Sequence, residues 1–326
     1  MIMLSRRTLL AATLPAIAPK LAYAQDPEDY PAHAVTFIVP FARGGGTDSL
    51  ARVFSDKLQE QFGQPFPVQN RPGEGTVLAT NFVAKSPPDG YTIMMAVSSI
   101  AIDATLYKKL PYDPAKDVAL LAVVATVPFV LVVSPTLPVN SVDDLIALAK
   151  QRPLSYGSGG IGAFHHLAAA VFASMAGIKM THVPYRGTLP ALNDLVAGYI
   201  QLMFADLGPA LPLISAGKLR PIAVTTTARL AALPNVPPLA QSGLPGFDLA
   251  AWQGMITSAK TPPDIVAKLN AKLNTLVATA DVRGRMRDLG MNPAPRKTPE
   301  ELTRFLQDEI VRWGKIVEAA GLAKSE

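Results

Sequence analysis

Two glycine-rich turns are the parts of this chain best suited to binding a small molecule. The first contains Gly44, Gly45 and Gly46, which follow an apolar run at residues 35–39 and precede the spacing of one apolar helix face. Such a turn directs backbone N–H groups outward at the positive end of a helix dipole, where they can hold an anion. We therefore predict ligand contact here; the alternative is a tight turn without a ligand.

A second turn of the same kind covers residues 157–162, with the sequence Gly-Ser-Gly-Gly-Ile-Gly. It matches the dinucleotide-binding spacing, but the strand before it is short and no acidic residue ends the next strand. We interpret it as a loop for a carboxylate and predict no cofactor. If the two turns face each other, a small anion is held between two sets of backbone donors, because ligands of open α/β sheets bind at such turns.

Side chains close to these turns have more than one interpretation. Arg43 and Arg186 could each pair with a carboxylate through two hydrogen bonds. Asp48 either contacts the ligand or caps the following helix. Asp206 could contact the far end of the ligand or form a hinge hydrogen bond, and Tyr185 could contact the ligand or pack in the core.

The sequence offers no convincing metal site or nucleophile. His165 and His166 are adjacent, so on a helix they point about 100° apart and cannot both bind one metal ion. The chain contains no cysteine, which excludes disulfides, zinc–thiolate sites and thiol chemistry. Ser215 and Lys218 match a Ser-x-x-Lys pattern, but the companion Lys-Thr-Gly is missing. We predict neither catalytic residues nor a bound metal, and a protein that is not an enzyme.

The first residues indicate export. A basic start at residues 5–7 precedes an apolar run and the small residues Ala22 and Ala24, which predicts a signal peptide at 1–24 cleaved after Ala24. The paired arginines also fit a twin-arginine signal, and general secretion stays open. Loss of this segment removes three of the positive charges, leaving +2 of the formal +5. So small a charge gives no reason to expect nucleic acid or an anionic membrane as partner.

The remaining chain alternates between strand and helix patterns, which predicts an α/β fold of β-α-β units with mostly parallel sheets. At 326 residues and 49% hydrophobic composition it is long enough for two domains. A long apolar stretch at 120–133, broken by Pro128, reads as strands passing between domains, and the Pro- and Gly-rich residues 234–246 as a crossover loop. Further helices are expected at residues 49–61, 78–84, 141–150 and 190–197, and from 261 and 298 onward.

Seven short segments carry further information about the chain. They are Pro-Phe-Ala-Arg-Gly-Gly-Gly-Thr-Asp at 40–48, Asn-Arg-Pro-Gly at 70–73, Pro-Asp-Gly-Tyr-Thr at 88–92, Leu-Pro-Tyr-Asp-Pro at 110–114, His-Val-Pro-Tyr-Arg-Gly at 182–187, Gly-Lys-Leu-Arg at 217–220 and Gly-Leu-Pro-Gly-Phe at 243–247. In order and spacing they resemble one family, the Bug substrate-binding proteins of tripartite tricarboxylate transporters. The resemblance covers essentially the whole chain after the signal peptide.

The resemblance implies a periplasmic, monomeric binding protein with the type II, or Venus-flytrap, fold: two lobes with mixed or parallel sheets joined by a hinge. It would capture a small carboxylate and pass it to membrane transporter subunits. The implied lobes are residues 25–125 plus 246–326, and residues 126–245. The implied ligand-binding residues are Phe41, Gly45, Gly46, Thr47, Asp48, Ser98 and Ser99 in the first lobe, and Ser158, Gly159, Ile161, Gly162, Tyr185, Arg186, Gly187 and Asp206 in the second.

The sequence departs from the family pattern at two places beside the expected cleft. Thr188-Leu189 replaces a glycine and a small residue, and Ala163-Phe164 replaces small polar residues. Phe164 and Leu189 therefore indicate a more apolar, for instance aromatic, carboxylate. Two other functions stay open: an exported α/β enzyme, either a hydrolase or an NADP-dependent oxidoreductase using residues 157–162, and a sensor that presents its ligand to a signalling receptor.

Overall fold

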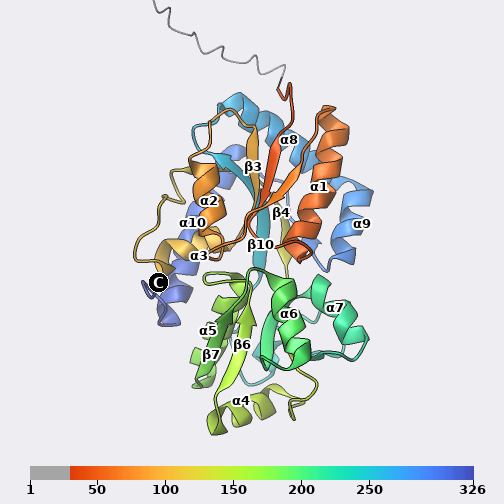
Figure 1. Ribbon diagram of the computed structural model, residues 1–326, viewed down its shortest axis with the longest axis vertical. Coiled ribbons are helices and arrows are strands. Elements are labelled where there is room, and N and C mark those ends of the chain that lie inside the picture. The colour runs from red at the N-terminus through yellow and green to blue at the C-terminus, as the bar shows by residue number, and fades with distance from the viewer. Residues whose placement is uncertain (1–29) are drawn as a thin grey trace, which may run out of the picture. The chain divides into compact units, whose positions relative to one another are not determined.

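The computed structural model describes residues 30–326, and residues 31–326 of these form one compact unit. The predicted signal peptide and its cleavage site lie outside the described residues. Two mixed β-sheets organise the compact unit (Figure 1). None of the helices within residues 30–326 combines the length and the apolar composition that a membrane span needs.

The first sheet has six strands in the order β11-β4-β10-β3-β1-β2. Strand β1 pairs in parallel with β2 and β3, whereas β10 pairs antiparallel with β3 and β4. The sheet is therefore parallel on one side and antiparallel on the other. Its strands are β1 (Thr36–Val39), β2 (Val68–Asn70), β3 (Thr92–Val97), β4 (Val118–Val127), β10 (Ala251–Ser258) and β11 (Asn292–Pro293).

Helices cover both faces of this sheet, as Figure 1 shows. On one side lie α1 (Gly46–Phe62), α8 (Pro263–Ala278) and α9 (Ala280–Asp288), and on the other α2 (Val77–Ala84), α3 (Ser99–Leu106) and α10 (Pro299–Ala319). Buried side chains such as Ile38, Met94 and Leu302 form the core between the sheet and the second group of helices. We call the sheet with these helices the first lobe.

The second sheet has five strands in the order β7-β6-β8-β5-β9. Strand β6 pairs in parallel with β7 and β8, and β5 pairs antiparallel with β8 and β9. With helices α5, α6 and α7 packed on it, this sheet forms the second lobe. Its elements are β5 (Phe129–Val133), α4 (Val142–Gln151), β6 (Leu154–Ser158), α5 (Phe164–Ala176), β7 (Met180–Pro184), α6 (Thr188–Ala197), β8 (Leu202–Asp206), α7 (Leu207–Ser215), β9 (Arg220–Val224) and a short 3-10 turn at Leu239–Gln241.

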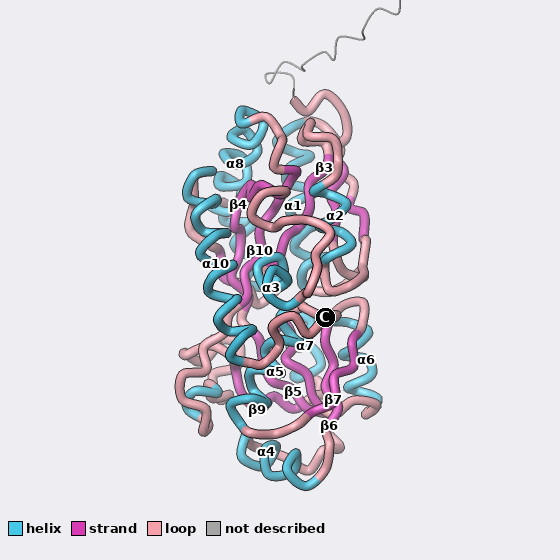
Figure 2. Tube along the Cα trace, turned by 90° about the vertical axis from the view of Figure 1, so that its left-hand side faces the viewer, coloured by secondary structure: helices cyan, strands magenta, loops and turns pink. Residues whose placement is uncertain are grey.

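The chain passes between the lobes twice. It leaves the first sheet at the end of β4 and enters the second at β5, with Pro128 between them, and it returns along the segment between β9 and β10. Helix α10 makes a further connection, because it packs on α3 and also contacts α5 (Figure 2). The ring of Trp313 on α10 meets that of Phe164 edge to face, with centroids 5.9 Å apart.

The predicted α/β class with two mixed-sheet lobes is confirmed, and so is the break at Pro128. The expectation of mostly parallel sheets is wrong for the strands near the crossings, since β4, β5, β9, β10 and β11 all pair antiparallel. The lobe boundaries in residue numbers stay a prediction.

Candidate functional site

The first glycine turn forms the start of helix α1. Gly45 is the N-cap residue and Gly46 the first helical residue, so the helix begins three residues earlier than predicted. Gly44 has φ +90°, and a Cβ there would lie 2.5 Å from Leu189 of the other lobe. The backbone therefore needs glycine at this position both for its conformation and for the close approach of the second lobe. Just before the turn, Ala42 N donates a 2.9 Å hydrogen bond to Arg186 O.

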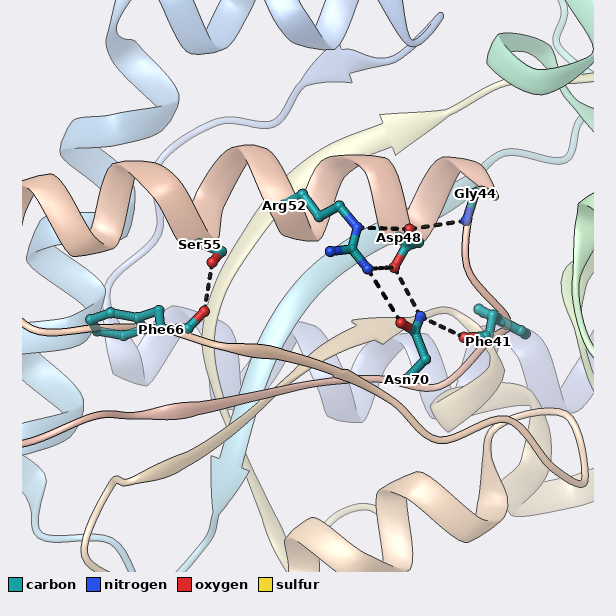
Figure 3. A network of polar contacts seen from close by, with 7 residues as sticks. All are labelled: Phe41, Gly44, Asp48, Arg52, Ser55, Phe66 and Asn70. Atoms are coloured by element: carbon teal, nitrogen blue, oxygen red, sulfur yellow. Dashed lines mark hydrogen bonds and ion pairs between the residues drawn. The ribbon is translucent and has the colours of Figure 1, made fainter.

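A partly buried polar network holds this turn in place (Figure 3). One carboxylate, that of Asp48, accepts hydrogen bonds from Gly44 N at 2.9 Å and from Arg52 Nε and Nη2 at 3.0 and 2.9 Å. Asn70 Nδ2 donates to the same carboxylate at 2.8 Å and to Phe41 O at 2.9 Å. The network thus ties the turn to the helix and to the neighbouring strand β2.

Asp48 had two interpretations, as a helix cap and as a ligand contact, and these contacts test only the first. The N-cap role is wrong, because Asp48 lies in the first turn of the helix and Gly45 is the cap. Burial pulls the pKa of Asp48 upward, but hydrogen bonds from Arg52, Asn70 and Gly44 N outweigh it and hold the pKa below its ordinary value. The side chain is therefore an ionised anchor for the turn, and its contact with a ligand stays a prediction.

The two glycine turns have different neighbours across the interface between the lobes. The nearest atoms to a Cβ built on Gly45 belong to Thr188, whereas those around Gly160 belong to Gly75 and Tyr185. A Cβ on Gly162 would meet the carboxyl group of Asp103. The closest neighbours therefore do not support the expectation that the two turns face each other directly.

A small cavity lies where the two sheets meet. Its volume is about 20 Å³, room for roughly one water molecule. Aromatic rings form much of its wall, and polar side chains from both lobes interrupt them. The lining residues are Phe41, Thr47, Val97, Ser98, Ser99, Val127, Phe129, Phe164, His165, Asp206, Ala251, Trp252 and Gln253.

Three side chains that line this small cavity each have a buried polar atom without a hydrogen-bond partner among residues 30–326. They are Ser99 Oγ, His165 Nδ1 and Gln253 Oε1, and each residue is at most 5% exposed. The other polar groups of the wall are paired: Gln253 Nε2 donates to Thr47 Oγ1 at 3.0 Å, and Trp252 N donates to Ser98 Oγ at 2.8 Å. Since buried polar atoms are normally satisfied, three unpaired ones at a single cavity indicate a place for a polar ligand.

A buried carboxylate stands at the second-lobe side of the small cavity. Asp206, at the end of β8, accepts hydrogen bonds from Thr188 Oγ1 and from His165 Nε2, the latter at 3.3 Å. Burial raises the pKa of Asp206, but the interaction with His165 and the hydrogen bond from Thr188 outweigh burial. The pKa therefore lies below its ordinary value, and the group is ionised. Both hydrogen bonds of the Asp206 side chain are thus to residues of its own lobe. Among the described residues it forms no side-chain hydrogen bond to the hinge, which was one of its two interpretations.

Two more histidines pack beneath the second turn. The rings of His166 and His182 stack with centroids 4.2 Å apart, and Tyr156 stacks on His182. Ser158 Oγ and His182 Nε2 lie 2.6 Å apart, and Gly162 N donates to His166 Nδ1 at 3.3 Å. Burial lowers the pKa of His166 to about 4, and burial with the charges of His166 and His165 lowers that of His182 to about 3. The pair is therefore neutral near pH 7 and supports the turn.

A larger cavity of about 600 Å³ opens at another part of the interface between the lobes. Its polar groups are already paired or exposed to water: Tyr185 Oη donates to Asp194 Oδ2 at 2.6 Å, and the Arg186 side chain is exposed. The Tyr185 ring packs against the core of the second lobe. The lining residues are Pro72, Gly73, Glu74, Gly75, Leu78, Tyr107, Gly159, Gly160, Ile161, Pro184, Tyr185, Arg186 and Glu326.

The predicted ligand-binding residues fall into three groups: those that line the small cavity, those that line the large cavity, and those that line neither. This grouping does not test ligand contact, so the role of every one of these residues remains a prediction. Phe41, Thr47, Ser98, Ser99 and Asp206 line the small cavity; Gly159, Ile161, Tyr185 and Arg186 line the large one; and Gly45, Gly46, Asp48, Ser158, Gly162 and Gly187 line neither.

Sequence reasoning missed several residues of the small cavity. Gln253 lies on β10, a strand that the sequence did not predict, and Phe129 begins β5 directly after Pro128. Trp252 packs in the core of the first lobe and also lines the cavity. Within residues 30–326, no three His, Cys, Asp or Glu side chains gather in a way that could hold a metal ion.

Comparison with known proteins identifies the family. A family model described as "Tripartite tricarboxylate transporter family receptor" matches residues 50–322. The chain belongs to this family. Among its relatives is Protein BugT of Bordetella pertussis, 35% identical over 90% of this chain and 91% of the relative. A protein from Pseudomonas sp. (strain P51), encoded between tcbD and tcbE, is 36% identical over 96% of this chain and 94% of the relative.

Solved structures of similar proteins share the fold. R. palustris Rpa4515, solved with adipate, is 39% identical with a TM-score of 0.86 over 90% of this chain and 99% of that one. MatC (Rpa3494) from Rhodopseudomonas palustris, with bound malate, is 32% identical with a TM-score of 0.84 over 88% and 100% of the two chains. The periplasmic binding protein BugD is 31% identical with a TM-score of 0.86. The family's members are thus periplasmic receptors that bind solutes, and a binding role follows for this chain.

Proposed function

We propose that this protein captures a small carboxylate with an apolar body between its lobes, outside the cytoplasm, and delivers it to the membrane subunits of a tripartite tricarboxylate transporter. The observation that carries the proposal is the presence in the small cavity of two unpaired buried groups able to donate to a carboxylate, Ser99 Oγ and His165 Nδ1. The third unpaired atom, Gln253 Oε1, only accepts, and it suits a hydroxyl group or a water molecule. Adipate and malate, bound by two relatives, are both carboxylates and support this ligand class.

The walls of the small cavity favour an apolar ligand body. Phe129 and Phe164 pack with centroids 4.2 Å apart, and Phe41 and Trp252 complete the aromatic lining. Burying apolar surface of a ligand against such rings contributes about 25 cal/mol per Å². A tricarboxylate would bring charged groups against these rings without partners, which costs free energy.

Binding requires the lobes to separate, because a cavity of about 20 Å³ admits roughly one water molecule and is too small for an organic carboxylate. We place the two lobes at residues 25–125 plus 246–326 and at 126–245, with hinges near Ala125 and Gly246. A ligand that contacts both lobes then favours the closed state, since only such a ligand distinguishes it from the open one. The protein acts as a monomer in this scheme, and the signal peptide at 1–24 directs its export.

A thermal-shift screen tests the proposal. The panel comprises hexanoate, benzoate, phenylacetate, adipate, malate and citrate, with NAD⁺ and NADP⁺ as controls for a cofactor-dependent enzyme. A ligand that binds only the folded state stabilises it by about 2.7 kcal/mol at 100 times Kd. We expect the apolar carboxylates to raise the melting temperature more than citrate does. A shift with the dinucleotides alone, or no shift with any carboxylate, would contradict the proposed function.

A further inference from the structure

His165 occupies a position that no structural role fully accounts for. It lies on the first turn of α5, is 5% exposed and lines the small cavity. Its Nε2 is 3.3 Å from Asp206 Oδ2 and 3.2 Å from Thr188 Oγ1. Its other ring nitrogen, Nδ1, is buried and has no hydrogen-bond partner in the described part of the chain. One side of the imidazole is therefore hydrogen-bonded, whereas the nitrogen on the other side is unpaired.

The contact on the held side determines what the open side can offer. Asp206 is buried, and His165 is the group with which it forms an ion pair. A buried carboxylate costs much free energy unless a cation and hydrogen bonds compensate it. With Nε2–H directed at Asp206, Nδ1 can donate a hydrogen bond only in the imidazolium form, in which both ring nitrogens carry a proton. In that form Nδ1–H is a buried donor that no acceptor among residues 30–326 meets.

We propose that His165 is the residue that recognises the charge of the ligand: its Nδ1–H donates to the ligand carboxylate, while Asp206 and Thr188 hold the ring from the opposite side. This inference rests on the proposed function and refines it. Hydrogen bonds between ionised partners are about twice as strong as neutral ones. The ligand class is therefore a carboxylate that is preferred over its own neutral amide, with its apolar part among the phenyl rings of the cavity.

The surroundings of Nδ1 agree with this role. A Cβ built on Gly159 would lie 3.3 Å from Nδ1, and Gly187 lies beside the same point. Glycine at position 159 therefore avoids a side chain crowded against the nitrogen. Gly159 and Gly187 were both among the predicted ligand-binding residues, and in this scheme the ligand carboxylate meets Nδ1 beside their backbone.

The test compares a carboxylate with its primary amide. Using the carboxylate of the panel above that binds most tightly, the dissociation constants of that acid and of its amide are measured by calorimetry for the wild type and for His165→Gln. We expect the wild type to prefer the carboxylate, and the substitution to reduce this preference at least tenfold. Asp206→Asn, which removes the ion pair but preserves the shape, should reduce it by a smaller factor.

His166→Gln is the matched control, because His166 is the adjacent buried histidine and is hydrogen-bonded to Gly162 N rather than lining the cavity. It should leave the preference unchanged. ¹⁵N NMR of the folded wild type provides a readout that needs no variant: both ring nitrogens of His165 should be protonated, and Nδ1 should shift on carboxylate binding.

The outcomes separate this inference from the proposed function. If His165→Gln binds the acid and the amide in the wild-type ratio, or if NMR finds a neutral ring in the complex, the role of His165 is refuted while the binding function stands. If the wild type binds no carboxylate of the panel, the proposed function itself fails, and this inference fails with it.

Discussion

The two cavities between the lobes differ in volume and also in whether their polar groups have hydrogen-bond partners. The large cavity has about 600 Å³ and the small one about 20 Å³. In the large cavity the Tyr185 hydroxyl is paired with Asp194, and Arg186 is exposed to water. In the small cavity Ser99, His165 and Gln253 each keep an unpaired buried atom. Unmet hydrogen bonds, rather than volume, therefore distinguish a candidate binding site from an ordinary gap between lobes.

This difference bears on what the closed state of a two-lobed binding protein looks like. The small cavity holds roughly one water molecule, so it must widen to admit a carboxylate, and its walls keep unpaired polar groups that a ligand can meet. The large cavity shows the reverse pattern, since the Tyr185 hydroxyl is paired and Arg186 is exposed. We therefore expect substitutions in the small cavity to affect ligand affinity far more than those in the large one.

The largest effect is expected from filling the small cavity. Ser99 is the first residue of α3 and is fully buried, so Ser99→Leu places a side chain where the ligand must lie. We expect the affinity for the best carboxylate of the panel to fall at least 100-fold, about 2.7 kcal/mol by RT ln K. Overpacking should cost about 1–3 kcal/mol of stability, which leaves a folded protein for the calorimetry.

Arg186→Ala is the matching substitution in the large cavity and serves as the control for Ser99→Leu. Because the side chain is exposed and no hydrogen bond of it is described, we expect the affinity to change less than threefold. If Arg186→Ala abolishes binding while Ser99→Leu is tolerated, the ligand occupies the large cavity, and the comparison drawn above is reversed.

A smaller effect should come from preventing the closure on which both cavities depend. Gly75 has φ +67°, and a Cβ there would clash with the backbone carbonyl of Ile161 in the second lobe. Gly75→Ala should therefore hold the lobes apart and lower ligand affinity about tenfold. Small-angle X-ray scattering should show that the radius of gyration no longer decreases on adding ligand.

Gly63→Ala separates the steric effect from backbone strain. Gly63 has φ +68°, almost the same conformation, but nothing lies within 4 Å of the position of its Cβ. Both variants should lose about 1 kcal/mol of stability from the strained conformation. Only Gly75→Ala should lose affinity; equal affinity loss in the two variants would show that the clash with Ile161 does not control closure.

The sequence predicted those parts of the fold that depend on local signals. Ser141 with Asp144 and Thr298 with Glu301 form capping boxes, and both helices begin where these residues indicated. Strand β10 escaped prediction because Gln253 and Gly254 interrupt its apolar pattern, although all its residues are buried. The Nε2 group of Gln253 donates to Thr47 Oγ1, 206 positions away in the sequence, a pairing that no local pattern can reveal.

The candidate site shows the same limit. The glycine turns could be found from the sequence because a strand, glycines and a helix follow one another directly. The ion pair of His165 and Asp206 joins residues 41 positions apart, and the hydrogen bond between Ser98 and Trp252 joins residues 154 positions apart. Resemblance to the Bug family supplied residues in both cavities, but only the three-dimensional structure separates them.

The mildest prediction concerns pH and the two stacked histidines beneath the second glycine turn. His166 and His182 have pKa values of about 4 and about 3 in the folded protein, because burial opposes their charge. In the unfolded chain a histidine titrates near pH 6.5, so the unfolded state binds more protons as pH falls below that value. Stability should therefore fall between pH 6.5 and 4.5, by at most about 1.4 kcal/mol per pH unit for each histidine.

Chemical denaturation at several pH values measures this slope. His182→Gln should flatten it by the contribution of one histidine, because glutamine does not titrate and keeps an amide near Ser158. Arg186→Ala should leave it unchanged, since an arginine on the wall of the large cavity stays charged throughout this range. Equal slopes in the wild type and in His182→Gln would mean that His182 becomes protonated in the folded state as easily as in the unfolded chain. The stacked rings beneath the second glycine turn would then be more accessible to water than their close packing, with centroids 4.2 Å apart, indicates.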